Sequence, residues 1–445
     1  MGGAQAASPG ASVGDVLRAG AASNPLRLPA QVPLAGYGSF SRRPWLPDLL
    51  GRHPAAFWFQ PSVGTRDAVM ARALVIERGN TRLLWVTVDL VAIDAEFASD
   101  LAARLRRRGL EFSALIVSAS HTHSGPGAFV DSTVLGLLVL DRFVPAVRAA
   151  ILDGLADTAV RADGRRAPAR LGSSAVAAPP VASSRLGLPL DPEIVVLKLI
   201  RRDGAPLAIL WNYAIHPTML GPRNLRLSGD LTGVASAAIE RAIGAPALFV
   251  NGAVGDVGPR EHGEQEVAGV ASRLAEAVLS TWRRVGTRDR GRLALARARV
   301  ALPEPFLSVR NCLGDWIPTQ LTVPLRGIFP SSVELIAIGL GDMAAVAVPG
   351  ELQTALGLDI KAAGRRAART VMVAGLSNGY VGYLLTGAAY RRPGYTACNS
   401  LYGFRGGEQI AAAAARLLER VGLAGYDSVA SRRASADFRR AAVLR

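Results

Sequence analysis

Five short apolar runs in this chain each end directly in an unusual polar motif. The runs ALIVSA, LAILWNYAI, ALFV, MAAVAV and VMVAGL are followed by SHTHSGPG, HPTML, NGAVGDVGP, PGE and SNGYVGY, in that order. In α/β proteins, the side chains just beyond the carboxyl ends of the strands line the crevice where ligands bind. The pattern therefore predicts one pocket that is assembled from five distant parts of the sequence.

The rest of the chain alternates strand-like apolar runs with amphipathic segments. We expect strands at residues 82–93, 114–118, 194–200, 207–215, 247–251, 292–302, 334–338, 344–348 and 371–374, with a hairpin turn at 339–342. Apolar residues at three-to-four spacing predict helices at 231–243, 267–282, 353–363 and 408–421, and Asp230 is a candidate cap for the first of them. This mixture favours an α/β fold, with a mixed β-sheet core flanked by helices and a metal site at the strand ends.

The composition is that of a globular protein with a large core. Of the 445 residues, 50% are hydrophobic and 19% are charged. No stretch rich in proline, glycine and serine divides the middle of the chain. We therefore expect one domain over residues 26–430, between a disordered tail at 1–25 and a basic tail at 431–445.

The sequence predicts neither a membrane span nor a signal peptide. The apolar stretch at 134–140 is interrupted by Asp141 and Arg142, and it is too short to cross a bilayer. Residues 1–25 lack a basic start followed by an apolar block. The default location is thus the cytoplasm, with a secreted or membrane-peripheral location as the alternative if the N-terminus is incomplete.

The formal net charge of +16 comes almost wholly from arginine, since Lys198 and Lys361 are the only lysines. Such an excess favours anionic partners, and we expect peripheral contact with anionic membranes. No arginine run is interleaved with aromatic residues, so nucleic acid is not an expected partner. The two cysteines, Cys312 and Cys398, form no CxxC pattern, and whether they pair stays open, as does the oligomeric state.

Two of the five histidines, His121 and His123, lie two residues apart in the first polar motif. In extended backbone that spacing directs both rings to the same face, so both can enter one pocket. His216 and Glu351 follow two other apolar runs. Zinc commonly binds histidine nitrogens and a carboxylate oxygen and leaves one position open in catalytic sites.

Each of these candidates also has an ordinary structural explanation. A lone histidine such as His216 is often a hydrogen-bonded structural residue, and Glu351 after a Pro-Gly turn can simply begin a helix. Tyr383 alone is typical of a core or a strand surface. Asp230 and Asp256 can be a helix cap and a turn former, respectively. The residues by themselves leave both interpretations open.

Taken together, the motifs resemble the neutral/alkaline (non-lysosomal) ceramidase family. The resemblance spans roughly residues 30 to 410, and HTHSGPG is its most specific string. The supporting segments are AGYGSF, ARALVIERGN, VTVDLVAI, SASHTHSGPG, DPEIVVLKL, NYAIHPTML, SGDLTGVAS, NGAVGDVGP, VPGELQT and GLSNGYVGY. Members of that family hydrolyse the amide of N-acylsphingosine at a zinc ion in an α/β domain.

The resemblance implies a set of site residues. By motif, the zinc ligands are His121, His216, Glu351 and Tyr383, and His123 contacts the reacting amide. In SSRLGLPLDPE, Arg185 lies where the family has an arginine of the active site. In AAYRRPGYTACNS, Tyr395 resembles a tyrosine beside the polar head of the substrate.

The chain also departs from the family pattern. The GDVSP motif of the family is GDVGP here, so Gly258 replaces a serine that is often considered catalytic. The C-terminal immunoglobulin-like domain and a secretion signal are not evident either. These departures put a serine mechanism, substrate access and location in doubt.

Our hypothesis from the sequence is a zinc-dependent amidohydrolase that acts on a lipid-like N-acyl substrate such as ceramide. The alternatives are a metal hydrolase of a different N-acyl amide or ester, and a catalytically weak lipid-binding relative. Residues 134–140 are candidates for the lining of an acyl-chain channel, although an ordinary buried helix explains them equally well.

Overall fold

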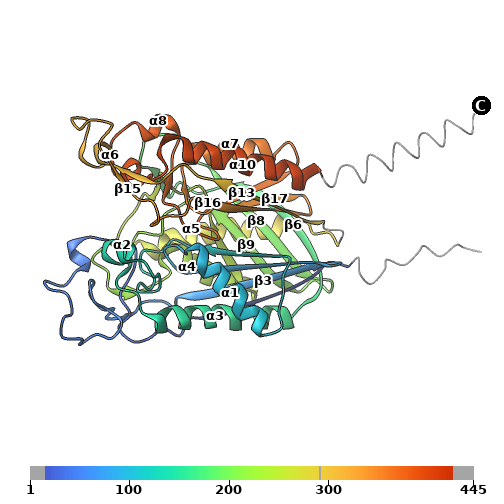
Figure 1. The fold of residues 1–445 in the computed structure, drawn as a ribbon. Coiled ribbons are helices and arrows are strands. Elements are labelled where there is room, and N and C mark those ends of the chain that lie inside the picture. Colours follow the sequence, from blue (N-terminus) through green and yellow to red (C-terminus); the bar gives the residue numbers. More distant parts are fainter. Residues whose placement is uncertain (1–15, 290–291, 424–445) are drawn as a thin grey trace, which may run out of the picture.

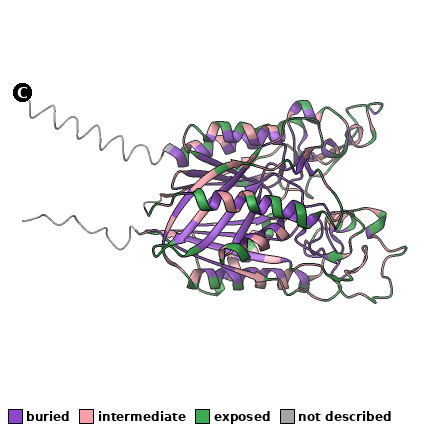
Figure 2. Cartoon of the chain, turned by 180° about the vertical axis from the view of Figure 1, so that it is seen from behind, coloured by how far each residue is buried: buried purple, intermediate pink, exposed green. Residues whose placement is uncertain are grey.

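The computed structural model describes residues 16–289 and 292–423. Two β-sheets lie face to face at the centre, and helices cover their outer faces (Figure 1). Figure 2 shows buried residues throughout the strands and along the inner sides of the helices. The expected α/β architecture, with a mixed sheet flanked by helices, is confirmed.

The larger sheet has eight strands in the order β11-β9-β8-β6-β1-β3-β4-β5. β4 pairs with β5 and β9 with β11 in parallel, whereas the other neighbours are antiparallel. The bounds are β1 Arg18–Pro25, β3 Met70–Arg78, β4 Thr81–Val88, β5 Ala114–Ala119, β6 Ala167–Ala177, β8 Glu193–Arg201, β9 Pro206–Tyr213 and β11 Ala247–Asn251.

The smaller sheet has the order β13-β16-β17-β19. β16 and β17 form the expected hairpin, and β17 pairs with β19 in parallel. The bounds are β13 Leu293–Ala301, β16 Ser332–Leu340, β17 Met343–Ala347 and β19 Thr370–Ala374.

An apolar layer joins the two sheets. Trp85 and Leu197 of the larger sheet belong to the same buried cluster as Ile338 and Met343 of the smaller one. Complete burial of a side chain of this size contributes about 1.5–3 kcal/mol, so this layer is a main source of the stability that holds the sheets together.

Three pairs of helices cover the outer faces. α1 (Ala95–Arg107) and α3 (Pro145–Gly164) pack on one half of the larger sheet, and α4 (Asp230–Ile243) and α5 (Val267–Arg284) pack on the other half. α7 (Thr354–Gly364) and α10 (Gly403–Leu423) cover the smaller sheet. Apolar residues at three-to-four spacing face the sheets, as the sequence predicted for α4, α5, α7 and α10.

The chain after β19 links the two edge strands of the larger sheet. The Gly375 N–H donates to the Asn251 carbonyl at the end of β11, at 2.9 Å, and the Ala119 N–H at the end of β5 donates to the Leu376 carbonyl, at 3.0 Å. The Asn251 side chain also donates to the Ser120 carbonyl, at 3.0 Å. The carboxyl ends of β5, β9 and β11 are therefore close in space, although β5 and β11 lie at opposite ends of the strand order.

Every strand and helix expected from the sequence is present, with shifted ends. The sequence interpretation missed β1, β3, β6, α1 and α3. β1 and β6 consist largely of alanine, glycine and serine, so they contain no apolar run. α3 buries one broad face, but that face includes Thr158 and several alanines while the apolar Val160 is exposed, which obscures the amphipathic pattern.

The expected boundary of the N-terminal tail is wrong, because Arg18–Pro25 pairs with β3 along its whole length. Residues 1–15 and the predicted basic tail at 431–445 lie outside the described residues. Cys312 and Cys398 form a disulfide, which answers the question that the sequence left open. Within the described ranges, no helix combines the length and apolarity that membrane crossing requires.

Asp230 does not cap α4 in the expected way. Gly229 is the cap residue, and Asp230 is the first helical residue, with a φ of 53°. Its carboxylate accepts hydrogen bonds from the Met219 and Leu220 N–H groups, just after His216. Burial raises the pKa of Asp230 to about 6. The residue thus anchors the turn that follows the histidine.

The segment at 134–140 is not a buried helix. α2 (Thr133–Leu135) continues into a π-helical turn at Gly136–Leu140, and Val134, Leu137 and Leu138 are exposed. The helical segment is too short to bury more than its inner side, where Leu140 joins the core.

Gly375 is a position where a side chain cannot fit, because a Cβ there would lie 2.3 Å from the Gly252 carbonyl oxygen. We expect Gly375→Ala to lower the free energy of unfolding by about 1–3 kcal/mol through overpacking. Gly269→Ala in α5 is the matched control, because a Cβ there meets no atom within 4 Å. That control should raise stability by about 0.5–1 kcal/mol. Denaturant unfolding of both variants checks this, and an unchanged Gly375→Ala protein would contradict the proposed packing.

Candidate metal centre

Three buried side chains meet where the carboxyl ends of the strands gather. The Glu351 Oε2 atom lies 3.1 Å from His216 Nε2 and 3.4 Å from His121 Nε2. His121 follows β5, His216 follows β9, and Glu351 begins β18 (Glu351–Leu352), which follows β17. The structure thus brings together three side chains from three of the five polar motifs.

The outer nitrogen of each imidazole is already bonded to the backbone. His121 Nδ1 lies 2.5 Å from the Val91 carbonyl oxygen, and His216 Nδ1 lies 2.7 Å from the Val257 carbonyl oxygen. A carbonyl oxygen only accepts, so each Nδ1 carries the proton and each Nε2 presents a lone pair to the site. This backbone bond is typical of histidines that bind metals.

The inward-facing atoms have no hydrogen-bond partner of their own. His121 Nε2, His216 Nε2 and Glu351 Oε2 are all buried and unpaired. A buried polar atom without a partner costs about 1–3 kcal/mol, so three of them in contact are unfavourable unless a ligand binds there. Two imidazole nitrogens and a carboxylate oxygen are a donor set that fits zinc.

Glu351 is held as a carboxylate. Burial alone would raise its pKa, but the neighbouring His121 and His216 rings hold that pKa well below its usual value. Its second oxygen, Oε1, accepts a hydrogen bond of 2.6 Å from the Tyr380 hydroxyl. Burial lowers the pKa of His216 to about 4, so this ring is neutral near pH 7. A negative oxygen therefore faces a neutral nitrogen, as metal binding requires.

The two histidines of the HTH motif face one site, but not for the expected reason. β5 ends at Ala119, and His121 has a φ of 73°, so the backbone is left-handed there and not extended. The Leu90 carbonyl accepts a hydrogen bond of 2.9 Å from the His121 N–H in this turn. The centroids of the His121 and His123 rings are 5.0 Å apart.

His123 lies beside the pair of histidines and is also neutral. Burial and the neighbouring rings hold its pKa well below its usual value, and neither of its ring nitrogens has a hydrogen-bond partner. Each of His121, His123 and His216 has a ring nitrogen within 4.8 Å of the others. The geometry thus allows two ligand triads, which share His121 and His216 and differ in whether Glu351 or His123 is the third member.

The other residues predicted from the resemblance surround the same cluster. Tyr383 begins β20 (Tyr383–Leu384), which pairs with β18 so that Tyr383 is the register neighbour of Glu351. Burial and the Glu351 charge raise the pKa of Tyr383 well above its usual value. Arg185 donates to the Tyr383 hydroxyl at 3.4 Å, and the Tyr395 ring lies 5.8 Å from the Tyr383 ring.

The GDVGP motif is bonded to the segment that follows Glu351, since the Gly255 N–H donates to the Leu352 carbonyl. The Asp256 carboxylate accepts hydrogen bonds of 2.7 Å from the Thr354 N–H and hydroxyl, and the Asp256 carbonyl accepts from the Arg185 N–H. Gly258 lies in β12 (Val257–Pro259), and a Cβ built there would be 3.7 Å from Arg185 Nε. Asp256 is thus more than a turn former, because it ties this loop to the start of α7.

Three residues of the site escaped the sequence interpretation. Tyr380 lies in the SNGYVGY motif, and Tyr37, whose ring is 4.7 Å from that of His123, lies in AGYGSF, so both motifs contained a signal. Arg42 belongs to no polar motif. Its buried guanidinium donates to the His123 carbonyl at 2.9 Å and to the Pro222 carbonyl at 2.9 Å.

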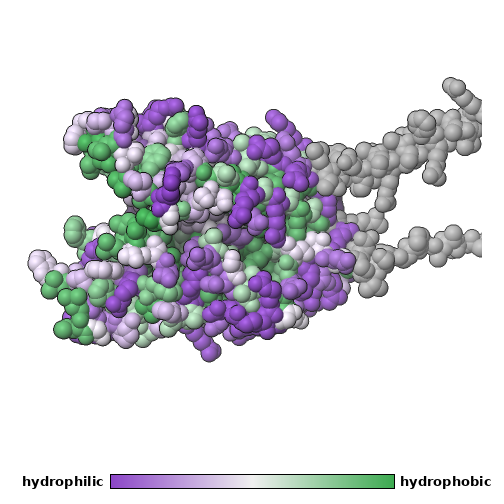
Figure 3. Space-filling model, in the orientation of Figure 1, coloured by the Kyte–Doolittle hydropathy of each residue, from purple (hydrophilic) through white to green (hydrophobic). Residues whose placement is uncertain are grey.

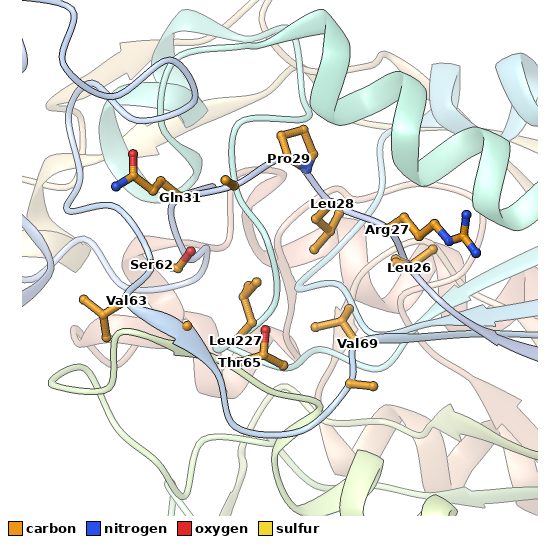
Figure 4. A pocket seen from close by; sticks show the side chains of 13 residues that line it. Leu26, Arg27, Leu28, Pro29, Gln31, Ser62, Val63, Thr65, Val69 and Leu227 are labelled. Carbon is orange, nitrogen blue, oxygen red and sulfur yellow. The ribbon is translucent and has the colours of Figure 1, made fainter.

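A surface pocket of about 640 Å³ is lined by none of these residues (Figure 4). Its walls come from residues 26–31, 62–65 and 68–69, with Leu227 at one side. The lining includes no histidine, cysteine or carboxylate, so this pocket offers none of the groups found in the metal centre.

Comparison with known proteins points to one family. The family described as "Neutral/alkaline non-lysosomal ceramidase, N-terminal" matches residues 56–277, about half of the chain. The neutral ceramidase of Pseudomonas aeruginosa is 29% identical over 211 residues, which are 43% of this chain and 31% of that protein. The neutral ceramidase of Mycobacterium tuberculosis is 27% identical over 207 residues, which are 42% and 32%. The match thus spans about a third of the length of these relatives.

Solved structures give a wider match. The crystal structure of the Pseudomonas aeruginosa neutral ceramidase aligns with a TM-score of 0.77 and 20% identity, over 91% of this chain and 74% of that one. A ceramidase complexed with C2 aligns with the same score and identity, over 93% and 76%. At this identity the comparison establishes a shared fold.

The two possible triads can be distinguished by the zinc content of variants that each lack one side chain. If Glu351 is the third ligand, His121→Ala, His216→Ala and Glu351→Ala each lose most of the bound zinc, while His123→Ala retains it. Elemental analysis of the four purified variants, with circular dichroism as a check on folding, distinguishes the cases. Zinc loss in His123→Ala together with retention in Glu351→Ala would assign the triad to the three histidines.

Proposed function

This chain belongs to the neutral/alkaline non-lysosomal ceramidase family, and from that membership we propose that it is a zinc-dependent amidohydrolase of ceramide-like lipids. The reaction splits the N-acyl amide into a fatty acid and a sphingoid-type amine. The observation that carries the proposal is the meeting of three unpaired buried atoms, His121 Nε2, His216 Nε2 and Glu351 Oε2.

The proposed zinc ligands are His121, His216, Glu351 and Tyr383. When bound, zinc supplies a Lewis acid that polarises the amide carbonyl and lowers the pKa of a water molecule. The backbone bonds of the two imidazoles and the Tyr380 hydrogen bond to Glu351 hold three of these groups in place before any ion arrives. Tyr383 is the weakest member of the set, because its environment without a cation favours the neutral phenol.

We assign to His123 the proton chemistry at the substrate amide. Its ring is neutral and its two nitrogens are not bonded to any protein group, so both are available to a substrate. An N–H of this ring can donate to the carbonyl oxygen as negative charge develops there, or a proton can pass to the departing amine. The Tyr37 ring packs against the His123 ring, and the Arg42 guanidinium donates to the His123 carbonyl.

Arg185 and Tyr395 are proposed to bind the polar part of the substrate. Both are exposed, unlike the buried histidines, so they lie on the open side of the site. Arg185 presents a cation and Tyr395 a phenol beside Tyr383. These groups can hydrogen-bond the hydroxyls of a sphingoid head. The apolar tails of the substrate would bind elsewhere.

The geometry does not favour a serine nucleophile. Ser124 is adjacent to His123 in the chain, but its hydroxyl accepts a hydrogen bond of 2.9 Å from the Asn224 amide. The His123 ring nitrogens bond to no hydroxyl, so no serine–histidine pair is formed there. Gly258 carries no oxygen at the position where the family has its serine.

The zinc requirement has a direct test. We expect a fluorescent ceramide to be hydrolysed by the purified protein, hydrolysis to stop on chelation, and zinc to restore it. Serine-directed fluorophosphonates should leave the rate unchanged. A panel of N-acyl amides and esters in the same assay identifies the preferred substrate class. Turnover that survives complete removal of metal would refute the proposed chemistry.

Gly258→Ser measures what the missing serine contributes. The nearest group to an added Cβ is Arg185 Nε at 3.7 Å, so the substitution fits without displacing its neighbours. We expect the turnover rate to change by roughly tenfold or less, because one added hydrogen bond contributes about 0.5–1.5 kcal/mol. Gly258→Ala is the control for the added volume. A covalent acyl-enzyme seen by mass spectrometry in Gly258→Ser would contradict a metal-dependent mechanism without a serine.

A further inference from the structure

We propose that two apolar lips on either side of the metal centre dock the protein on an anionic lipid bilayer. The first lip comprises residues 40–50 and 134–138, and the second comprises residues 313–328. The inference rests on the proposed function, because a lipid substrate is the reason for this protein to bind a bilayer. It adds the surface, the orientation and the chemistry of the partner.

Exposed large apolar side chains are concentrated in these segments. The first lip exposes Phe40, Trp45, Leu46, Leu49, Leu50, Val134, Leu137 and Leu138, and the second exposes Leu313, Trp316, Leu321, Val323 and Ile328. Trp45 is 96% exposed and Trp316 is 77% exposed. Isolated exposed apolar residues are ordinary, but groups of this kind mark a binding surface.

The two parts of the first lip are joined to each other and to the site. The Arg43 guanidinium donates to the Leu137 carbonyl at 2.5 Å, which ties residues 40–50 to residues 134–138. The adjacent Arg42 donates to the His123 carbonyl, and the Tyr37 ring packs against the His123 ring. The first lip is therefore linked by direct contacts to His123, which lies beside the proposed metal ligands.

The second lip reaches the opposite side of the same centre. It follows α6 (Val309–Leu313), and the disulfide from Cys312 to Cys398 ties it to α9 (Tyr395–Cys398). α9 carries Tyr395, whose ring packs near Tyr383. In Figure 1 the two lips project from the same end of the molecule, and Figure 3 shows the surface hollowed between them, with apolar atoms on both sides.

The charges beside the lips fit an anionic surface. Residues 385–405, next to the second lip, include Arg391, Arg392 and Arg405 and no acidic residue. The first lip carries the half-buried Arg43 and one acid, Asp48, whereas the adjacent Arg42 is buried. The second lip itself carries Arg326 and one acid, Asp315. Lipid surfaces bind segments that combine inserted tryptophan and leucine with nearby arginine, and each basic residue adds to the attraction. Two projecting lips, one on each side of the site, would let a lipid pass from the bilayer between them.

Vesicle co-sedimentation of the full chain tests this, with phosphatidylcholine vesicles that contain or lack phosphatidylglycerol and carry no ceramide. The first-lip variant combines Trp45→Ser with Leu50→Ser, and the second-lip variant combines Trp316→Ser with Leu321→Ser. Val160→Ser on α3, also an exposed apolar position, is the matched control. We expect the wild type and the control to pellet with anionic vesicles. Each lip variant should bind these vesicles at least roughly tenfold more weakly.

The charge contribution is measured separately. Arg392→Ser should weaken binding to vesicles with phosphatidylglycerol and leave binding to pure phosphatidylcholine unchanged, whereas Arg283→Ser near the end of α5 should change neither. Added salt should reduce the difference between the two kinds of vesicle.

Several outcomes would overturn the proposal. One is equal pelleting of wild type and both lip variants, and another is failure of the wild type to bind anionic vesicles. A dimer that both lip variants abolish, seen by analytical ultracentrifugation without vesicle binding, would assign the lips to a second copy of the chain. Turnover of a short-chain, water-soluble N-acyl substrate separates this test from the proposed function: lost vesicle binding with retained turnover supports the lips, and absent turnover with retained binding overturns only the hydrolase.

Discussion

The hydrogen bonds between the chain after β19 and the two edge strands of the larger sheet are the constraint on which the site depends. Gly375 bonds to the end of β11, and Leu376 accepts from the end of β5, so one short segment draws together strands at opposite ends of the sheet order. A side chain at Gly375 has no room, because the Gly252 carbonyl lies against it. The Asn251 side chain, which donates to the Ser120 carbonyl, and the His123 N–H, which donates to the Pro217 carbonyl, also link the loops that carry His121 and His216.

The same contacts create an unfavourable arrangement that only a ligand relieves. Two imidazole nitrogens and one carboxylate oxygen face one another in a buried place, and none of them has a hydrogen-bond partner. The surrounding bonds make the arrangement rigid, since Val91, Val257 and Tyr380 occupy the outer atoms of the same side chains. The fold thus carries the free-energy cost of these unpaired buried atoms, and a cation bound there would offset it.

The site lies at one end of the molecule, between the lips that we propose as a lipid-docking surface. Its groups change in character from the inside outwards: buried histidines and Glu351, then Tyr383, then the exposed Arg185 and Tyr395. The disulfide between Cys312 and Cys398 fixes the outer part, where short elements alone would hold it weakly. This gradient suits a substrate with an amide at depth and a polar head near the surface.

Much of this protein was determined by the sequence itself. Apolar runs predicted the strands, and the polar motifs at their ends predicted that His121, His216 and Glu351 meet, because strand ends collect at one edge of an α/β sheet. The GDVGP motif identified Gly258 as the departure from the family pattern. Periodicity could not reveal β1 or β6, whose small residues form no apolar run. It also missed α3, whose buried face includes Thr158 and several alanines while the apolar Val160 is exposed.

Only the tertiary structure decided which atoms face the site and which segments surround it. The turn at His121 is left-handed and not extended, and the pairing of Cys312 with Cys398 was open until the two came together in space. Arg42 lies in no motif, yet it donates to the His123 carbonyl. Residues 134–140, for which the sequence left a channel lining and a buried helix both open, expose Val134, Leu137 and Leu138. The physical reason is that burial and periodicity are local properties of a sequence, whereas the orientation of a side chain depends on partners that arrive from distant parts of the chain.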